Sequence, residues 1–124
     1  MADSKEMQVI LKAIDLIEHT LRITSNINHY PKKYRHSLVD RMQLKSMDIY
    51  ESLHEANRKN LRTCRAKRQE LQTDAITYCD QLLIYIELSH KLNLITANSM
   101  EYWSKQVKDI KHMAIAWRTK EAGK

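Results

Sequence analysis

Glycine and proline are almost missing from this chain of 124 residues, which contains one of each, Gly123 and Pro31. Tight hairpin turns and glycine-rich phosphate-binding loops need backbone angles that glycine supplies most easily. Strands joined by hairpins, and active sites built on such loops, are therefore not expected. The sequence predicts an all-α protein.

Cysteine and long apolar runs are scarce as well. Cys64 and Cys79 have neither the spacing of a zinc knuckle nor the density of a disulfide scaffold, so we expect two reduced thiols. No apolar stretch is long enough to cross a bilayer or to serve as a secretory signal. We expect no membrane partner and a cytoplasmic location.

The remaining composition suits one small domain with a strongly solvated surface. Apolar residues make up 43% of the chain and charged residues 29%, with 21 Lys and Arg against 15 Asp and Glu, a formal net charge of +6. A chain of this length buries enough surface to form one hydrophobic core. We expect a single domain over residues 1–124.

Apolar residues recur every three or four positions in four segments, the pattern of amphipathic helices. The segments start after a capping pair at Asp3 and Glu6, at a capping signal at Ser37, after a break near 60–63, and after a turn at 93–96. The break near 60–63 is placed where the apolar stripe lapses. Four such helices with short connections predict an up-down-up-down antiparallel four-helix bundle.

The first helix has two apolar lines on roughly opposite sides. We expect the longer line to face the core, and the shorter line either to widen the core contact or to pack against another subunit, which predicts a homo-oligomer. The longer line is Met7, Ile10, Leu11, Ile14, Ile17 and Leu21, and the shorter line is Val9, Ala13, Leu16 and Ile23.

The other three helices each have one main apolar stripe, which we expect to face the core. Ser46 interrupts the stripe of the second helix. The predicted core residues are Val39, Met42, Ile49, Leu53 and Ala56, then Leu71, Ala75, Tyr78, Leu82, Tyr85 and Leu92, then Met100, Trp103, Val107, Ile110, Ala114 and Trp117.

Positive charge is concentrated in residues 58–68, which contain no Asp or Glu. A charge run is usually a solvated face, but its position at one end of a helical bundle makes an anionic polymer, RNA or DNA, a candidate partner. The candidate binding residues there are Arg58, Lys59, Arg62, Arg65, Lys67 and Arg68. Alternating topology brings Arg118, Lys120 and Lys124 to the same end. A second basic group, Lys32, Lys33, Arg35, His36 and Arg41, is expected at the other end.

Catalytic and metal chemistry find little support in the sequence. The Glu-x-x-His pattern of di-iron bundles occurs at Glu51 and His54 and again at Glu87 and His90. With a turn near residue 62, the two histidines stand roughly 30 Å apart along the bundle, too far for one shared site. We expect no catalytic residues, metal or cofactor. A metal-dependent bundle enzyme remains a third class that stoichiometric iron or manganese would support.

Residues 30–42, from Tyr30-Pro31 through Arg35 to Arg41-Met42, resemble the motif entering the second helix of the accessory variability determinant of diversity-generating retroelements. The wider group includes the four-helix proteins encoded in 23S ribosomal RNA intervening sequences. This resemblance implies a noncatalytic homopentamer that binds nucleic acid and a reverse transcriptase during template-directed mutagenesis. It carries over Arg35 and Arg41 as binding positions.

Two functional hypotheses follow from these observations. The leading one is a noncatalytic nucleic-acid-binding accessory subunit whose lysines and arginines neutralise phosphates. The alternative is a structural or protein-interaction module of the intervening-sequence type, whose basic ends meet an acidic protein surface or keep the oligomer soluble.

Overall fold

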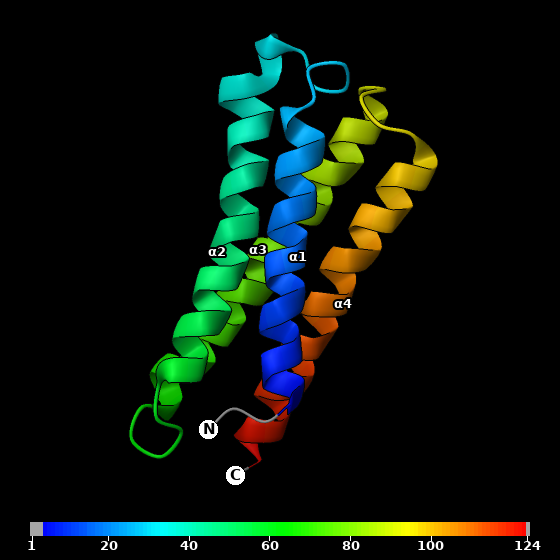
Figure 1. Ribbon diagram of the computed structural model, residues 1–124. Coiled ribbons are helices and arrows are strands. Elements are labelled where there is room, and N and C mark those ends of the chain that lie inside the picture. Colours follow the sequence, from blue (N-terminus) through cyan, green and yellow to red (C-terminus); the bar gives the residue numbers. More distant parts are fainter. Residues whose placement is uncertain (1–3, 124) are drawn as a thin grey trace.

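The computed structural model describes residues 4–123, in which every regular element is helical (Figure 1). The four long helices are α1 (Ser4–Ser25), α2 (Asp40–Arg58), α3 (Arg65–Lys91) and α4 (Ala97–Ala122). They run alternately up and down, so α1 begins and α4 ends at the same end of the bundle. The predicted four-helix bundle is confirmed. Asp3 and Lys124 lie outside the described residues.

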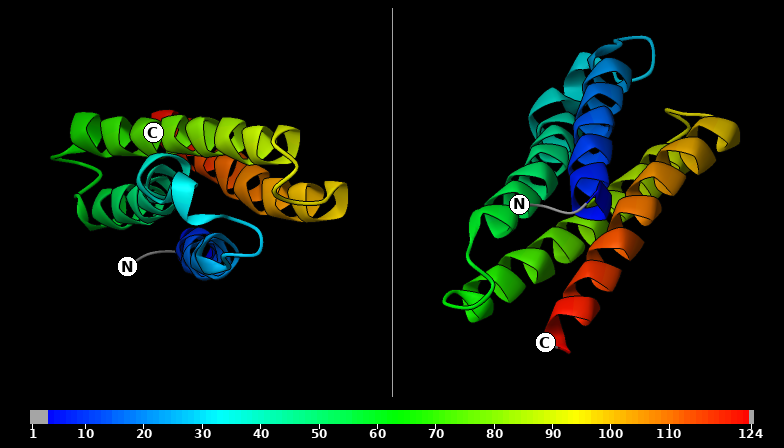
Figure 2. Two further views of the ribbon diagram at one scale, coloured as in Figure 1. Left: turned by 90° about the horizontal axis from the view of Figure 1, so that it is seen from above. Right: turned by 60° about the horizontal axis from the view of Figure 1, so that its bottom comes forward.

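The helices pack in a ring in the order of the chain. α1 lies against α2 and α4, and α3 completes the ring between α2 and α4. Figure 2 shows α3 on the far side of the bundle from α1. The side of α1 that faces away from α2 and α4 is therefore not covered by another part of the described chain.

An asparagine residue stabilises each of the two turns that flank α3. Between α2 and α3, the Asn60 Oδ1 atom accepts hydrogen bonds from the backbone N–H groups of Arg62 and Thr63, at 2.8 and 3.1 Å. After α3, Asn93 takes a left-handed backbone angle, φ 61°. These turns lie where the sequence predicted breaks, near 60–63 and 93–96.

The entry into α2 differs from the prediction at Ser37. A short 3-10 helix (Lys32–Tyr34) and a π-helical segment (Arg35–Val39) lead directly into α2. Within them, the Ser37 hydroxyl donates to the Tyr34 carbonyl at 3.4 Å and does not cap the helix. The capping assignment was wrong because the chain is already helical before Ser37.

The two apolar lines of α1 are largely exchanged relative to the prediction. Val9, Ala13 and Leu16 are almost fully buried, whereas Met7, Leu11 and Ile14 are 46%, 53% and 45% exposed. Of the line predicted to face the core, Ile10 is buried as expected, and Ile17 and Leu21 are half-buried. Of the two alternatives for the Val9 line, the core contact is confirmed and the packing against another subunit is wrong, because this line forms the chain's own core.

Buried threonines explain the exchange of faces on α1. Thr20 and Thr24 continue the inner line and are 0% and 3% exposed. The Thr20 hydroxyl accepts a hydrogen bond from Trp103 Nε1 at 3.1 Å, and the Thr24 hydroxyl accepts one from Gln43 Nε2 at 2.9 Å. A buried polar group with a partner carries little penalty, so hydrophobicity alone pointed to the wrong face.

The stripes of α2 and α4 face the core as predicted, with Met100 only half-buried and Ser46 buried among its apolar neighbours. α3 departs from its prediction: Leu71, Tyr78 and Tyr85 are half-buried and Leu92 is exposed. Its inner line consists of Arg68, Gln72, Ala75, Ile76, Cys79, Leu82, Ile86 and Ser89. Charged and polar members of that line were not recognised as core residues.

Cys64 and Cys79 are both free thiols, and burial raises the pKa of Cys79 to about 12. In residues 4–123, none of the helices combines the length and apolar character needed to cross a membrane.

Candidate nucleic-acid interface

The predicted cationic residues lie at two opposite ends of the bundle. Arg35 and Arg41 are exposed at the end where the chain enters α2. The other eight belong to the end formed by the turn 59–64 and the C-terminus of α4, which we call the basic end. Arg41 and Arg58 lie near the two ends of α2, roughly 25 Å apart at ~1.5 Å per residue. The ten residues therefore do not form one continuous site.

Arg58 and Arg62 are the most available cations of the basic end. Both side chains are exposed, and within residues 4–123 neither forms an ion pair with a carboxylate. Lys67 is exposed too, and its Nζ lies 3.5 Å from Glu70 Oε2. An exposed pair of this kind is weak, so Lys67 can exchange Glu70 for another anion at little cost.

Three other cations of the basic end have partners within the protein. Lys59 Nζ lies 3.0 Å from Glu55 Oε1, and Arg118 Nη1 donates to the Thr73 hydroxyl at 3.2 Å. Arg65 Nη1 donates to the Glu121 carbonyl oxygen at 2.5 Å and is half-buried. Arg65 therefore joins α3 to the end of α4, as the alternating topology predicts.

Arg68 does not belong to the exposed cations, which corrects the sequence-based expectation. It is 7% exposed, and its Nε and Nη2 atoms donate to the two carboxylate oxygens of Glu121 at 2.8 and 2.5 Å. Its Nη1 atom donates to the carbonyl oxygens of Ala56 and Lys59, at 2.9 and 2.8 Å. Every guanidinium nitrogen is thus occupied inside the protein, so Arg68 is a structural residue.

Glu121 is the residue that the sequence analysis missed. Besides Arg68, its carboxylate accepts hydrogen bonds from Gln72 Nε2 at 2.8 Å and from Trp117 Nε1 at 2.7 Å. Burial alone would raise the pKa of Glu121, but these hydrogen bonds and the charge of Arg68 outweigh it and lower the pKa. We call Arg68, Gln72, Trp117 and Glu121 the Arg68 cluster.

A signal for this cluster was present in the sequence. Glu121 is the only acid in the last turn of α4, and the topology places that turn beside the first turn of α3. By binding the carbonyl oxygens that end α2, Arg68 fixes the start of the turn 59–64 against α3 and α4. The cluster therefore holds the backbone from which Arg58 and Arg62 project.

The start of α3 adds to the positive potential of the basic end. No acidic residue lies in its first turn, and Cys64, which precedes the helix, makes no side-chain capping hydrogen bond. The first N–H groups of a helix and its macrodipole favour anions at that position. Together with Arg58, Arg62 and Lys67, they make a surface suited to phosphate oxygens.

The Glu-x-x-His pairs belong to different regions of the bundle. Glu51 and His54 lie in the second half of α2, close to the basic end, whereas Glu87 and His90 lie at the far end of α3. In the part of the chain that the structure describes, His, Cys, Asp and Glu side chains do not gather in groups of three that would suit a metal ion.

Comparison with known proteins identifies the fold. No family model matches the sequence, and the search of curated proteins finds no match. The structure is similar to the crystal structure of a protein of unknown function from the S23 ribosomal protein family of Bacteroides thetaiotaomicron VPI-5482. The TM-score is 0.81 and the sequence identity 15%, over 93% of this chain and 98% of that one. At this level of identity the two chains share the four-helix fold.

Proposed function

We propose that this protein is a noncatalytic nucleic-acid-binding accessory subunit whose basic end contacts the phosphate backbone. The observation that carries the proposal is the exposure of Arg58 and Arg62, without carboxylate partners among the described residues, beside a helix start that lacks acids. Cations that contact phosphates without entering a groove of the nucleic acid contribute affinity but recognise little of the base sequence.

The polymer and its protein partner are proposed from similarity. The S23 ribosomal protein family of the structural neighbour supports RNA as the first polymer to test. The resemblance of residues 30–42 to the retroelement accessory protein supports a reverse transcriptase as partner and a role in mutagenic retrohoming. A cytoplasmic location is part of this proposal. The same resemblance assigns Arg35 and Arg41, at the opposite end of the bundle, to that assembly.

The salt dependence of binding tests the proposal. With Arg68 buried, about three cations shown above to be exposed, Arg58, Arg62 and Lys67, are available for phosphates of a single strand. The slope of log affinity against log salt concentration is then about −2. Fluorescence anisotropy with a labelled single-stranded RNA of mixed sequence, and with DNA of the same sequence, measures this slope. A slope near zero contradicts the proposal.

Charge reversal locates the interface. The double variant Arg58→Glu/Arg62→Glu should weaken binding at least tenfold, because both residues are exposed and their loss leaves the core intact. The matched control Lys12→Glu/Lys108→Glu makes the same change in net charge at exposed positions on α1 and α4. If the control weakens binding equally, net charge and not the basic end determines the affinity.

A second candidate function is a homo-oligomeric interaction module, and the exposed apolar line of α1 favours it. Met7, Leu11 and Ile14 follow one another at intervals of about one helical turn, on the side of α1 that the described chain does not cover. We propose that this line forms the contact between subunits, with a pentamer as the assembly that the retroelement resemblance implies. This assembly is compatible with nucleic-acid binding at the basic end.

A further inference from the structure

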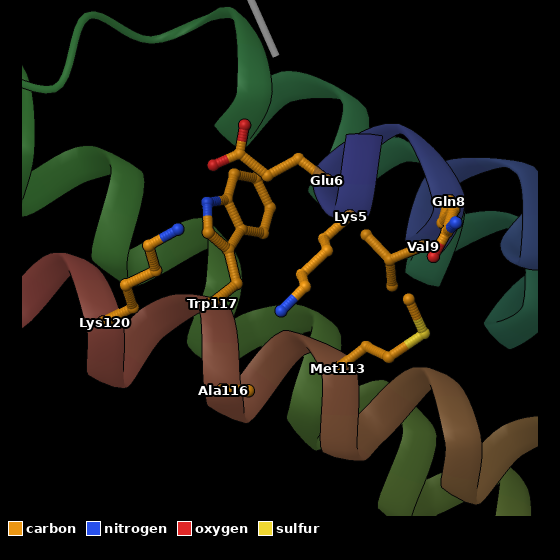
Figure 3. Close-up of a pocket in the computed structure, with 8 residues that line it drawn as sticks. All are labelled: Lys5, Glu6, Gln8, Val9, Met113, Ala116, Trp117 and Lys120. Atoms are coloured by element: carbon orange, nitrogen blue, oxygen red, sulfur yellow. The ribbon is translucent and has the colours of Figure 1, made fainter. Parts of the chain in front are cut away.

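A groove between the entry into α2 and the end of α3, which we call the α2–α3 groove, has a volume of about 270 Å³. Its lining is mainly the carbon surface of leucines and tyrosines, namely Leu38, Leu88, Leu92, Tyr34 and Tyr85. The cleft between the start of α1 and the end of α4 is different (Figure 3). There Trp117 is only 6% exposed, and Lys5 and Lys120 already interact within the protein. The α2–α3 groove therefore offers a partner the more accessible apolar surface.

One wall of this groove belongs to an exposed apolar ridge on α3. Leu88 and Leu92 line the groove, and Ile84, one turn earlier, continues the ridge beyond it. The three residues follow one another at four-residue intervals, so they lie on the same side of the helix. Their exposed fractions are 62% for Ile84, 39% for Leu88 and 40% for Leu92. An amphipathic helix presents its own apolar residues at this spacing and can therefore pack along the ridge.

Arg41 gives the groove a positive charge, and no Asp or Glu of the described chain lines it. Arg41 is exposed, and within residues 4–123 it has no ion pair, side-chain hydrogen bond or contact with an aromatic ring. The neighbouring acids face other directions. Asp40 Oδ2 lies 3.4 Å from His36 Nδ1, and Glu87 projects about 100° around α3 from Leu88. The Arg41 guanidinium is therefore available to a carboxylate of a partner.

Two lysines add to this positive charge. Lys33 Nζ lies 5.2 Å from the ring centroid of Tyr34, which lines the groove. Lys45, one turn after Arg41 on α2, has its Nζ 5.2 Å from the ring centroid of Tyr78. These cation–π contacts leave the charge of each ammonium group in place. Three cations beside an apolar groove without acids make a surface complementary to a negatively charged partner.

From these features we infer that the α2–α3 groove docks an acidic amphipathic helix of a partner protein. The apolar residues of that helix pack along Ile84, Leu88 and Leu92, and the Asp or Glu side chains beside its apolar stripe meet Arg41 and Lys45. A protein helix suits this surface better than a nucleic acid, because sugars and phosphates would gain little from contact with leucine side chains.

The groove is separate from the other surfaces to which a function is assigned. Its lining residues lie at the opposite end of the bundle from Arg58 and Arg62, so the inference does not rest on nucleic-acid binding at the basic end. Figure 2 shows α3 on the far side of the bundle from α1. The groove therefore does not overlap the exposed line of α1 that we propose as the subunit contact.

Binding of a designed peptide to the full chain tests the inference. The probe is the capped, fluorescein-labelled peptide EAELEALLAELEAE, which as a helix has one leucine stripe with glutamates on both sides. Fluorescence anisotropy should show saturable binding with a Kd below about 0.5 mM. The counterpart KAKLKALLAKLKAK, with lysine in place of glutamate, should bind at least tenfold more weakly. A peptide with serine in place of the leucines, EAESEASSAESEAE, should also bind at least tenfold more weakly.

Two variants of the groove, each with a matched control, locate the peptide. Leu88→Glu and Arg41→Glu should each weaken binding of the acidic peptide at least fivefold, while the helical circular dichroism spectrum is unchanged because both side chains are exposed. Leu44→Glu makes the same substitution at an exposed leucine of α2 outside the groove. Arg58→Glu makes the same change of charge at the other end of α2. Both controls should bind the peptide as the unchanged protein does.

Several results would overturn the inference. No saturable binding of the acidic peptide, equal affinity for the lysine or serine counterpart, or undiminished binding by either groove variant would each do so. Conversion of an oligomer to a monomer by Leu88→Glu would assign the groove to a second copy of this chain. Displacement of the peptide from Arg58→Glu/Arg62→Glu by single-stranded RNA would assign it to nucleic acid. RNA binding by the unchanged protein reports separately on the basic end, so failure of one proposal is distinguishable from failure of the other.

Discussion

Arg68 and Glu121 form a buried ion pair whose disruption should lower the stability of the protein. Each is almost fully buried, and removing one leaves the other as an uncompensated charge inside the bundle. Arg68→Met should therefore lower the free energy of unfolding by about 3–5 kcal/mol. Arg62→Met, an exposed position on the neighbouring turn, should change it by less than about 0.5 kcal/mol. Urea denaturation followed by circular dichroism measures both.

The double variant Arg68→Met/Glu121→Met distinguishes two causes of this loss of stability, the unpaired charge and the missing hydrogen bonds to the backbone. Because both members of the buried pair are removed together, it should recover most of the stability that Arg68→Met loses. A double variant as unstable as the single one would show that hydrogen bonds from Arg68 to the backbone, rather than the charge pair, hold the turn 59–64.

The Glu121 carboxylate also makes stability depend on pH. Because its folded-state pKa is lowered, its contribution is fully present above the unfolded value of about 4.3 and is lost as pH falls through the lower folded value. Between pH 6 and pH 3, the unchanged protein should thus lose more unfolding free energy than Arg68→Met/Glu121→Met does. Parallel losses in urea titrations at the two pH values would contradict this assignment.

At the scale of helices, Asn93 shows how a chain with a single glycine ends a long helix. The Leu94 N–H donates to the Ser89 carbonyl and the Asn93 N–H to the His90 carbonyl, each at 2.9 Å, while Asn93 takes φ 61°. This is the arrangement in which glycine usually follows the helix, and asparagine is the common substitute.

The left-handed angle makes Asn93 sensitive to its replacement. Asn93→Ala should lower the free energy of unfolding by about 1 kcal/mol, because a Cβ without a compensating polar group is strained there. Asn93→Gly should be at least as stable as the unchanged protein. Asn98→Ala, an exposed asparagine within α4, is the control and should lose nothing. Equal melting temperatures for Asn93→Ala and Asn98→Ala would refute the argument.

The helices were predictable from sequence because apolar spacing repeats over many turns, and the break near 60–63 was found because that spacing lapses. Which side of a helix faces inward was less predictable. Hydrophobicity alone gives no reason to place Thr20, Thr24 or Arg68 in the core, yet each is buried with hydrogen-bond partners supplied by other helices. Spacing along one helix contains no information on partners from another.

At the scale of the whole molecule, the proposed assembly into an oligomer would strengthen binding at the basic end. The exposed line of α1 begins at the same end of the bundle as the turn 59–64. A symmetric oligomer formed through that line would hold several basic ends at fixed spacing, and a polymer bound to one would meet the others at high effective concentration.

Assembly through α1 is therefore the property to test first. Leu11→Glu places a charge in the middle of the exposed line and should convert the oligomer to a monomer while the helical circular dichroism spectrum is unchanged. Leu44→Glu is the matched control, since Leu44 is 56% exposed on α2 against 53% for Leu11. Sedimentation velocity should report oligomer for the unchanged protein and the control, and monomer for Leu11→Glu. A monomeric unchanged protein would exclude the subunit contact and leave each basic end to bind alone, with the weaker affinity that one set of phosphate contacts provides.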